Sequence, residues 1–188
     1  MQPEFAEKNF NKFIFWFKNP RNLVIAGLIV VALIALVFFL FSRKNQGTAE
    51  NPTVKINRPY TVVARTKERK STDGNLKLTV TNAQIGNSVL VQGKTARPVK
   101  GKVFLIINME IENSYKVALY AFPVDLFRFV RSDGQKFAPS VHQGTVEIRP
   151  QATKKSNIAF VVSPDDKKFK IEIGEIGKEK ETLEITFR

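Results

Sequence analysis

The sequence contains no cysteine and a single histidine, His142. The lack of cysteine excludes a disulfide framework, a thiolate zinc site, a thiol nucleophile and anchoring through a lipidated cysteine. One histidine, two methionines and scattered carboxylates do not supply the clustered ligands that a metal ion needs. A hydrolytic triad would have to use His142 with a serine such as Ser140 or Ser156, and the sequence has no Gly-x-Ser-x-Gly elbow. We therefore expect no metal, no cofactor and no enzymatic activity.

Acidic residues are also scarce, with 17 Asp and Glu against 30 Lys and Arg, a net charge of +13. Residues 1–44 hold six basic and two acidic side chains, a balance of +4, and the rest hold 24 and 15, a balance of +9. A basic surface attracts polyanions, so anionic lipid and acidic cell-wall polymer are the expected partners. A solvated surface without such a partner explains the charge equally well. We do not expect nucleic acid, because the aromatic residues are assigned mainly to membrane and core.

Charged residues are absent from Leu23 to Phe41, a 19-residue stretch that also lacks proline and hydroxyl groups. As a helix it would be roughly 28 Å long, close to the ~30 Å hydrocarbon core of a bilayer. A core helix would show one polar face, and this stretch has none. A signal peptide would be shorter and end at small residues, whereas Ser42, Arg43 and Lys44 follow here. The stretch predicts an uncleaved transmembrane helix at residues 23–41.

Residues 1–22 carry a helical apolar stripe opposite a basic side. The stripe consists of Ala6, Phe10, Phe13, Ile14 and Phe17. It predicts an amphipathic segment in the membrane interface, and the alternative is a bent first half of the membrane helix. Four basic residues lie near each side of the span, so their count leaves the orientation open. We expect a cell-membrane protein with a cytoplasmic N-terminus and an extracytoplasmic C-terminal domain, because lysines of the amphipathic segment suit the anionic cytoplasmic leaflet.

Residues 42–58 are polar, contain Gly47 and Pro52, and are interpreted as a linker before a domain at residues 59–188. A short strand is expected at Tyr60 to Ala64, followed by a turn at residues 71–75. Between them lies the densest basic run of the chain, which is the candidate polyanion-binding site, namely Arg65, Lys67, Arg69 and Lys70. On a loop near the membrane it would bind anionic headgroups or wall polymer. The alternative is an exposed loop without a ligand.

From Leu76 onward the apolar residues alternate with polar ones. This period of two predicts half-buried strands. The clearest segments are 76–81, 103–112, 127–130, 158–162, 169–173 and 183–187. Asp133-Gly134 predicts a hairpin turn, and Pro164-Asp165-Asp166 predicts another turn in which aspartate caps its own backbone. Short strands with frequent turns and no helical period between them predict an all-β antiparallel sandwich. In its core, Ile107 and Phe160 should face inward and Glu110 and Lys170 outward.

Three segments carry a family resemblance. They are the strand KVFLIINMEIEN leading to Asn113, the hairpin FRFVRSDGQKF, and IRPQATKKSNIAFVVSP, in which Gln151 stands where glycine usually follows Pro150. The stretch from Lys102 to Glu175 resembles a family of bacterial membrane-anchored extracytoplasmic domains of unknown function. That family is related to the immunoprotective extracellular protein β-sandwich. The resemblance implies an immunoglobulin-like sandwich, export and a membrane tether, and it implies no catalytic residues.

Two functions fit this sequence. The first is a non-enzymatic, membrane-tethered extracytoplasmic binding or adhesion-type module. The second is a structural subunit of a cell-envelope membrane protein assembly, in which the membrane helix packs against other envelope proteins. Gly27, Ala32 and Ala35 would allow such packing, although there is no Gly-x-x-x-Gly motif.

Overall fold

The computed structural model describes residues 24, 28, 31–34 and 51–188. The chain forms two compact units, Met1–Ala49 and Glu50–Arg188. The described residues of the first unit are α-helical. Among all described residues, no helix is long and apolar enough to cross a membrane. The predicted amphipathic segment and most of the predicted transmembrane helix lie outside the described residues.

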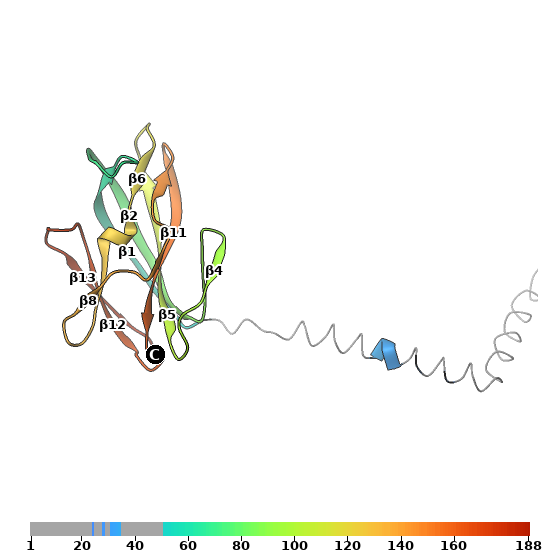
Figure 1. Ribbon diagram of the computed structural model, residues 1–188. Helices are drawn as coiled ribbons and strands as arrows, with labels where there is room; N and C mark the ends of the chain where they lie inside the picture. Colours follow the sequence, from blue (N-terminus) through green and yellow to red (C-terminus); the bar gives the residue numbers. More distant parts are fainter. Residues whose placement is uncertain (1–23, 25–27, 29–30, 35–50) are drawn as a thin grey trace, which may run out of the picture. The chain divides into compact units, whose positions relative to one another are not determined.

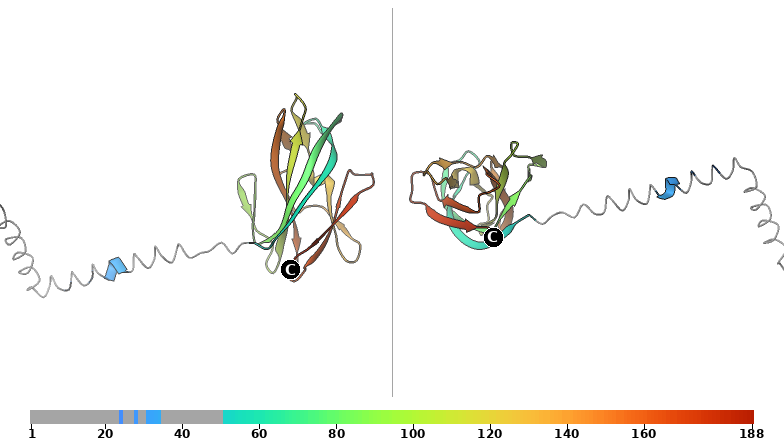
Figure 2. Two further views of the ribbon diagram at one scale, coloured as in Figure 1. Left: turned by 180° about the vertical axis from the view of Figure 1, so that it is seen from behind. Right: turned by 90° about the horizontal axis from the view of Figure 1, so that it is seen from below.

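The second unit is built on a seven-stranded antiparallel sheet (Figure 1). Its long strands are β1 (Thr53–Arg65), β2 (Ser71–Gly86), β5 (Val103–Asn113) and β11 (Ala152–Val162). Three short strands complete it, namely β6 (Leu119–Ala121), β9 (Val141–His142) and β10 (Val146–Ile148). The order is β10-β6-β1-β2-β5-β11-β9, so β2 lies at the centre, and β10 and β9 form the two edges. Figure 2 shows the long strands side by side from behind.

A smaller antiparallel sheet of four strands lies over this one in the order β13-β12-β7-β8. Its strands are β7 (Phe127–Val130), β8 (Lys136–Phe137), β12 (Lys168–Ile173) and β13 (Glu181–Thr186). A one-turn helix, α3 (Pro123–Leu126), leads into β7. A separate hairpin of β3 (Val89–Val91) and β4 (Lys94–Ala96) covers the outer face of the large sheet, where Val89 packs near Phe104.

One hydrophobic core fills the space between the two sheets. It combines Ile107 of β5 and Phe160 of β11 with Ile171 of β12, none of which is more than 1% exposed. Lys170 is exposed and Glu110 is half-exposed. The strand phases read from the period of two are therefore confirmed, as is the all-β antiparallel sandwich.

The strand order differs from the predicted immunoglobulin-like one. In an immunoglobulin-like sandwich the second strand pairs with the fifth, and the third belongs to the opposite sheet. Counting strands of four residues or more, the second here (β2) pairs with the third (β5), and the fourth (β7) lies in the opposite sheet. Because only the β3–β4 segment connects β2 to β5, neighbours in sequence pair directly. The immunoglobulin-like order is wrong, and the coarser sandwich architecture holds.

The structure also corrects the first boundaries of the domain. β1 begins at Thr53, inside the segment 42–58 interpreted as a linker, because Val54 and Ile56 pack against the core in alternation with polar residues. The predicted turn at 71–75 is part of β2, where Asn75 pairs with Val63. The turn lies instead at residues 66–70, closed by the Thr66 N–H donating to the Lys70 carbonyl at 2.9 Å. Cross-strand pairing outweighs the local turn preference of these residues.

The sandwich has two ends. The entry end is where the chain enters at Asn51, since Ile85 donates its N–H to the Pro52 carbonyl at 3.0 Å and β5 starts opposite Gly86. This end also holds the C-terminus (Figure 1) and the loops 97–102, 131–135 and 163–167. The far end holds the loops 66–70, 114–118, 149–151 and 174–180. The candidate basic run thus lies at the opposite end from the chain entry, not beside it.

Buried Asn113 connects two loops of the far end. Its Nδ2 donates to the carbonyl of Val117 at 2.8 Å and to those of Ile148 and Arg149 at 3.1 Å each. Its Oδ1 accepts the Tyr115 N–H at 2.9 Å. Gln151, expected to form an unconventional turn, has a φ of 49° and donates its N–H to the Tyr115 carbonyl at 3.0 Å. That left-handed conformation is the one glycine usually takes in such turns.

Candidate functional site

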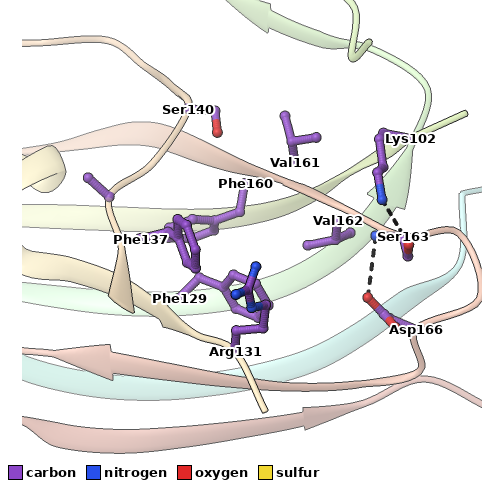
Figure 3. Close-up of a pocket in the computed structure, with 11 residues that line it drawn as sticks. Lys102, Phe129, Arg131, Phe137, Ser140, Phe160, Val161, Val162, Ser163 and Asp166 are labelled. Carbon is purple, nitrogen blue, oxygen red and sulfur yellow. Dashed lines mark hydrogen bonds between the residues drawn. The ribbon is translucent and has the colours of Figure 1, made fainter. Parts of the chain in front are cut away.

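A groove of about 390 Å³ opens at the edge of the sandwich, toward the entry end. It lies between the two sheets, with Phe129 and Phe137 contributed by the small sheet and Phe160 by the large one (Figure 3). β8 and β9 are the edge strands on this side, and they have only two residues each. Because these edge strands are so short, the two layers are left uncovered there.

The floor of the groove is aromatic. The ring centroids of Phe129 and Phe160 are 6.0 Å apart, and those of Phe129 and Phe137 are 6.4 Å apart. Tilted ring pairs at such distances are favourable packing arrangements. Phe160 is 1% exposed whereas Phe137 is 41% exposed. The solvent exposure of the floor therefore increases from Phe160, which is part of the core, to Phe137 at the mouth. An entering apolar group would contact Phe137 first.

Polar groups line the rim. Lys102 Nζ donates to Ser163 Oγ at 3.0 Å, and Asp166 Oδ2 accepts the Ser163 N–H at 3.3 Å (Figure 3). Arg131 lies over the Phe137 ring, with its guanidinium carbon 5.3 Å from the ring centroid. The same guanidinium forms an ion pair with Asp133. The predicted capping of the 164–166 turn is confirmed for Asp166, and Asp133 caps its own turn by accepting the Gln135 N–H at 3.0 Å.

The two rim cations differ in how they are balanced. The hydrogen bond from Arg131 lowers the pKa of the Asp133 carboxyl, so this pair stays ionised and nearly neutral in sum. Within residues 51–188 no ion pair involves Lys102. Its ammonium group donates a hydrogen bond to the uncharged Ser163 hydroxyl. An apolar floor with a few polar groups at the mouth is the usual composition of a small-molecule or side-chain binding site. The groove can hold an apolar group whose polar end meets Lys102.

The candidate basic run is only partly free to bind a ligand. Arg65 forms an ion pair with Glu175 at 2.5 Å, and Arg69 forms one with Asp125 at 2.6 Å. Arg69 also stacks on the Phe122 ring at 4.4 Å. Lys67 and Lys70 are exposed, and no ion pair to either is found within residues 51–188. The structure thus places the four residues on one hairpin, with internal carboxylates balancing two of them.

Within residues 51–188, no hydrogen bond joins His142 to Ser140 or Ser156, the two serines weighed for catalysis. His142 Nδ1 accepts the backbone N–H of Gly144 at 3.0 Å, which commits one ring nitrogen to a local turn. Ser156 is 6% exposed and its hydroxyl lies in the wall of the sandwich. Across residues 51–188 and the few described residues before them, no cluster of three His, Asp or Glu side chains could hold a metal ion.

Sequence reasoning missed the groove. Phe129 and Phe160 were expected in strands, but alternation cannot show where two sheets part. One signal was available, because a hairpin turning at Asp133-Gly134 places Phe137 opposite Phe129, and these two residues do pair. An aromatic pair next to Arg131 at the end of a hairpin could have marked this edge.

A family model described as "Domain of unknown function (DUF4352)" matches residues 66–182, which cover most of the sandwich. The chain belongs to this family. Because DUF4352 is defined without a function, membership supports the β-sandwich domain and assigns no ligand.

Solved structures of three bacterial proteins match this DUF4352 chain in part. An uncharacterized β-sandwich protein from Clostridium difficile 630 shares 18% identity, with a TM-score of 0.45, over 60% of this chain and 86% of that one. A conserved hypothetical protein from Bacillus anthracis shares 14% identity, with a TM-score of 0.45, over 73% and 99%. A functionally unknown protein from Listeria monocytogenes EGD-e shares 10% identity, with a TM-score of 0.37, over 73% and 88%. No curated protein matches the chain.

Proposed function

We propose that this chain is a non-enzymatic, membrane-tethered extracytoplasmic binding module, with the groove at the sandwich edge as its binding site. The observation that carries the proposal is the floor of Phe129, Phe137 and Phe160 beneath a polar rim. Its volume of about 390 Å³ lies within the usual size range of ligand pockets, roughly 300–1,000 Å³. The lining includes no histidine, and Lys102 Nζ donates its hydrogen bond to Ser163 Oγ at 3.0 Å, so we assign the groove to binding.

The membrane tether is supported by the sequence. The uncharged stretch from Leu23 to Phe41 has the length of a bilayer span, and the amphipathic segment before it suits the interface. The resemblance to membrane-anchored extracytoplasmic domains, including the relation to the immunoprotective extracellular protein β-sandwich, supports export of the domain. A folded domain after the span is translocated largely regardless of its charge, so the +9 balance is compatible with export.

The tether and its orientation are tested by proteolysis. Protease added to intact bacterial spheroplasts should release the sandwich domain, because the segment between residue 41 and Asn51 would lie outside the membrane. Lysed spheroplasts serve as the control for intrinsic cleavage. Full protection of the domain in intact spheroplasts, with cleavage after lysis, would reverse the proposed topology.

The groove is tested with 2-naphthoate, an aromatic ring joined to an anion. In the full chain reconstituted in lipid nanodiscs, titration should shift the NMR signals of Ala138 and Val162, which line the groove. Phe137→Ser removes the accessible ring and should weaken binding roughly tenfold, since an aromatic contact and its burial contribute on the order of 1–2 kcal/mol. Val117→Ser, at the exposed far end, is the matched control. Equal affinity in both variants would argue against the groove.

One observation favours the structural-subunit alternative. The far end exposes Val117 at 60% and Tyr115 at 40% in the loop 114–118, and Ile176 at 64% in the loop 174–180. Exposed apolar side chains of this kind are candidates for contacts with another protein. Isolation of the full chain from native membranes with a stoichiometric envelope protein, lost in Val117→Ser and Ile176→Ser, would favour this second function.

A further inference from the structure

The loop 97–102 at the entry end presents an apolar side chain among cations. Its sequence is RPVKGK, and Val99 is 68% exposed. The Lys102 N–H donates to the Val99 carbonyl at 3.1 Å, which folds the loop into a turn that begins at Val99 and has Lys100 and Gly101 at its tip. Arg97 and Lys100 are exposed on either side of Val99. An exposed aliphatic group flanked by cations is a pattern suited to the interface of an anionic bilayer.

A second loop extends this surface. Lys102 Nζ donates to Ser163 Oγ at 3.0 Å, which joins the loop 97–102 to the loop 163–167. The second loop ends at Lys167, followed by Lys168 at the start of β12, and both are exposed. Together the two segments hold five cations, against the two carboxylates of the Asp165-Asp166 turn. Within residues 51–188, no ion pair involves any of these five cations.

The far end differs in charge balance. There, Arg65 and Arg69 are held by Glu175 and Asp125, so two of its cations are offset within the fold. At the entry end, Arg131 is paired with Asp133, but the five cations of the segments 97–102 and 163–168 have no ion pair within residues 51–188 and keep their charge for an external anion.

The length of the segment between the apolar stretch and the domain indicates which anionic surface lies closest to the entry end. Nine residues, 42–50, separate the apolar stretch from Asn51. At no more than ~3.6 Å per residue they span at most about 36 Å. Asn51, where the chain enters this end, would thus remain within about 36 Å of the apolar stretch. This short tether gives a membrane-facing surface a high effective concentration of lipid headgroups.

We propose that the entry end is a docking surface for an anionic lipid bilayer, with Val99 at the headgroup level and the surrounding lysines and arginine on lipid phosphates. This inference rests on the proposed membrane tether. Because Lys102 and Ser163 also belong to the rim of the groove, docking places the mouth of the groove beside the lipid headgroups. The anionic lipid itself, rather than a soluble polyanion, is the partner that this geometry fits.

The absence of cysteine allows a single reporter to be placed at will. Val99→Cys and, at the far end, the similarly exposed Val117→Cys are each labelled with an environment-sensitive NBD fluorophore in the full chain. The chain is reconstituted in vesicles of phosphatidylcholine with or without phosphatidylglycerol, and quenching by bilayer-embedded spin-labelled lipid is measured. Strong quenching is expected at position 99 only, and only with phosphatidylglycerol. It should be lost at roughly 1 M salt, where the Debye length falls from ~8 Å to ~3 Å.

Two variants with equal loss of charge test whether lipid binding depends on the entry end or on the net charge of the whole domain. Replacing the exposed cations of the entry end should reduce the ratio of docked to free domain several hundredfold, since each contributes roughly fivefold near an anionic surface. This variant carries Arg97→Ser, Lys100→Ser, Lys167→Ser and Lys168→Ser, and it leaves Lys102 in place. The control removes the same charge from the far end by Lys67→Ser, Lys70→Ser, Lys116→Ser and Arg149→Ser, and it should keep the quenching.

The outcomes also separate docking from the tether. Vesicle flotation after an alkaline carbonate wash reports the tether alone. If the chain floats but position 99 is quenched no more than position 117, or if both charge variants lose quenching equally, docking is overturned and the tether stands. A chain that does not float overturns both.

Discussion

Replacing Asn113 by alanine is expected to lower the free energy of unfolding by roughly 3 kcal/mol or more, because each buried polar group left without a partner costs about 1–3 kcal/mol. The side chain is 1% exposed and makes four hydrogen bonds, three to carbonyls and one from a backbone N–H. Its amide links the loop after β5 to the segment between β10 and β11. Water does not readily replace the bond to the Ile148 carbonyl, because Ile148 is fully buried.

The matched control for this prediction lies on the same strand. Asn108 is half-buried and donates one side-chain hydrogen bond, to Asn82 Oδ1 at 2.8 Å. Asn108→Ala should therefore cost about 1 kcal/mol, the net value of a typical hydrogen bond. Urea unfolding of residues 50–188, followed by circular dichroism, gives both values. Equal losses in the two variants would mean that the network around Asn113 adds nothing beyond a single contact.

Ile107→Ala is expected to cost about 2–5 kcal/mol, the range for removing a large aliphatic side chain from a packed core. Ile107 is fully buried at the centre of β5, between strands β2 and β11. The surrounding strands are fixed by continuous pairing, so the site has little freedom to close around a cavity.

Glu110→Ala is the control for the core variant. The Glu110 side chain is 41% exposed and lies 3.6 Å from Lys155 Nζ. Exposed pairs of this kind contribute little, so the change should stay below roughly 0.5–1 kcal/mol. Similar unfolding midpoints for the two variants would mean that the inward phase of β5 has been misread.

Much of the fold could be predicted from the sequence because apolar and polar residues alternate along several of its strands. Alternation at Leu105, Ile107 and Met109 sets the inward face of β5, and the structure places these residues in the core. β1 was harder, since Val54 and Ile56 are only half-buried among polar neighbours. Strands of two or three residues, such as β8 and β9, are too short to show any period, and their pairing depends on partners far away in the chain.

The strand order and the groove could not be predicted for a related reason. Periodicity reports which face of a strand is buried, and it does not report which strand lies next to it. The assignment of β5 to the sheet of β2 follows from pairings such as Ile107 with Ala83, which only the three-dimensional structure reveals. The groove depends on where the two sheets separate around Phe137. The basic run could be found from the sequence because its cations are close together in the chain. Its ion pairs could not, because the partners of Arg65 and Arg69 lie 110 and 56 residues away in sequence.

The pairing of β5 with β11 also constrains how the domain can fold. Eleven consecutive residue pairs join residues 103–113 to residues 152–162 without a register shift. β1, β2 and β5 can assemble as a local meander. One full edge of β5 then has no hydrogen-bonding partner until β11 forms, and β11 begins almost forty residues later. Contacts this distant form slowly, and an open edge of this length invites pairing with other chains. During synthesis, the chain therefore has a period of vulnerability to aggregation that ends only when β11 closes the sheet.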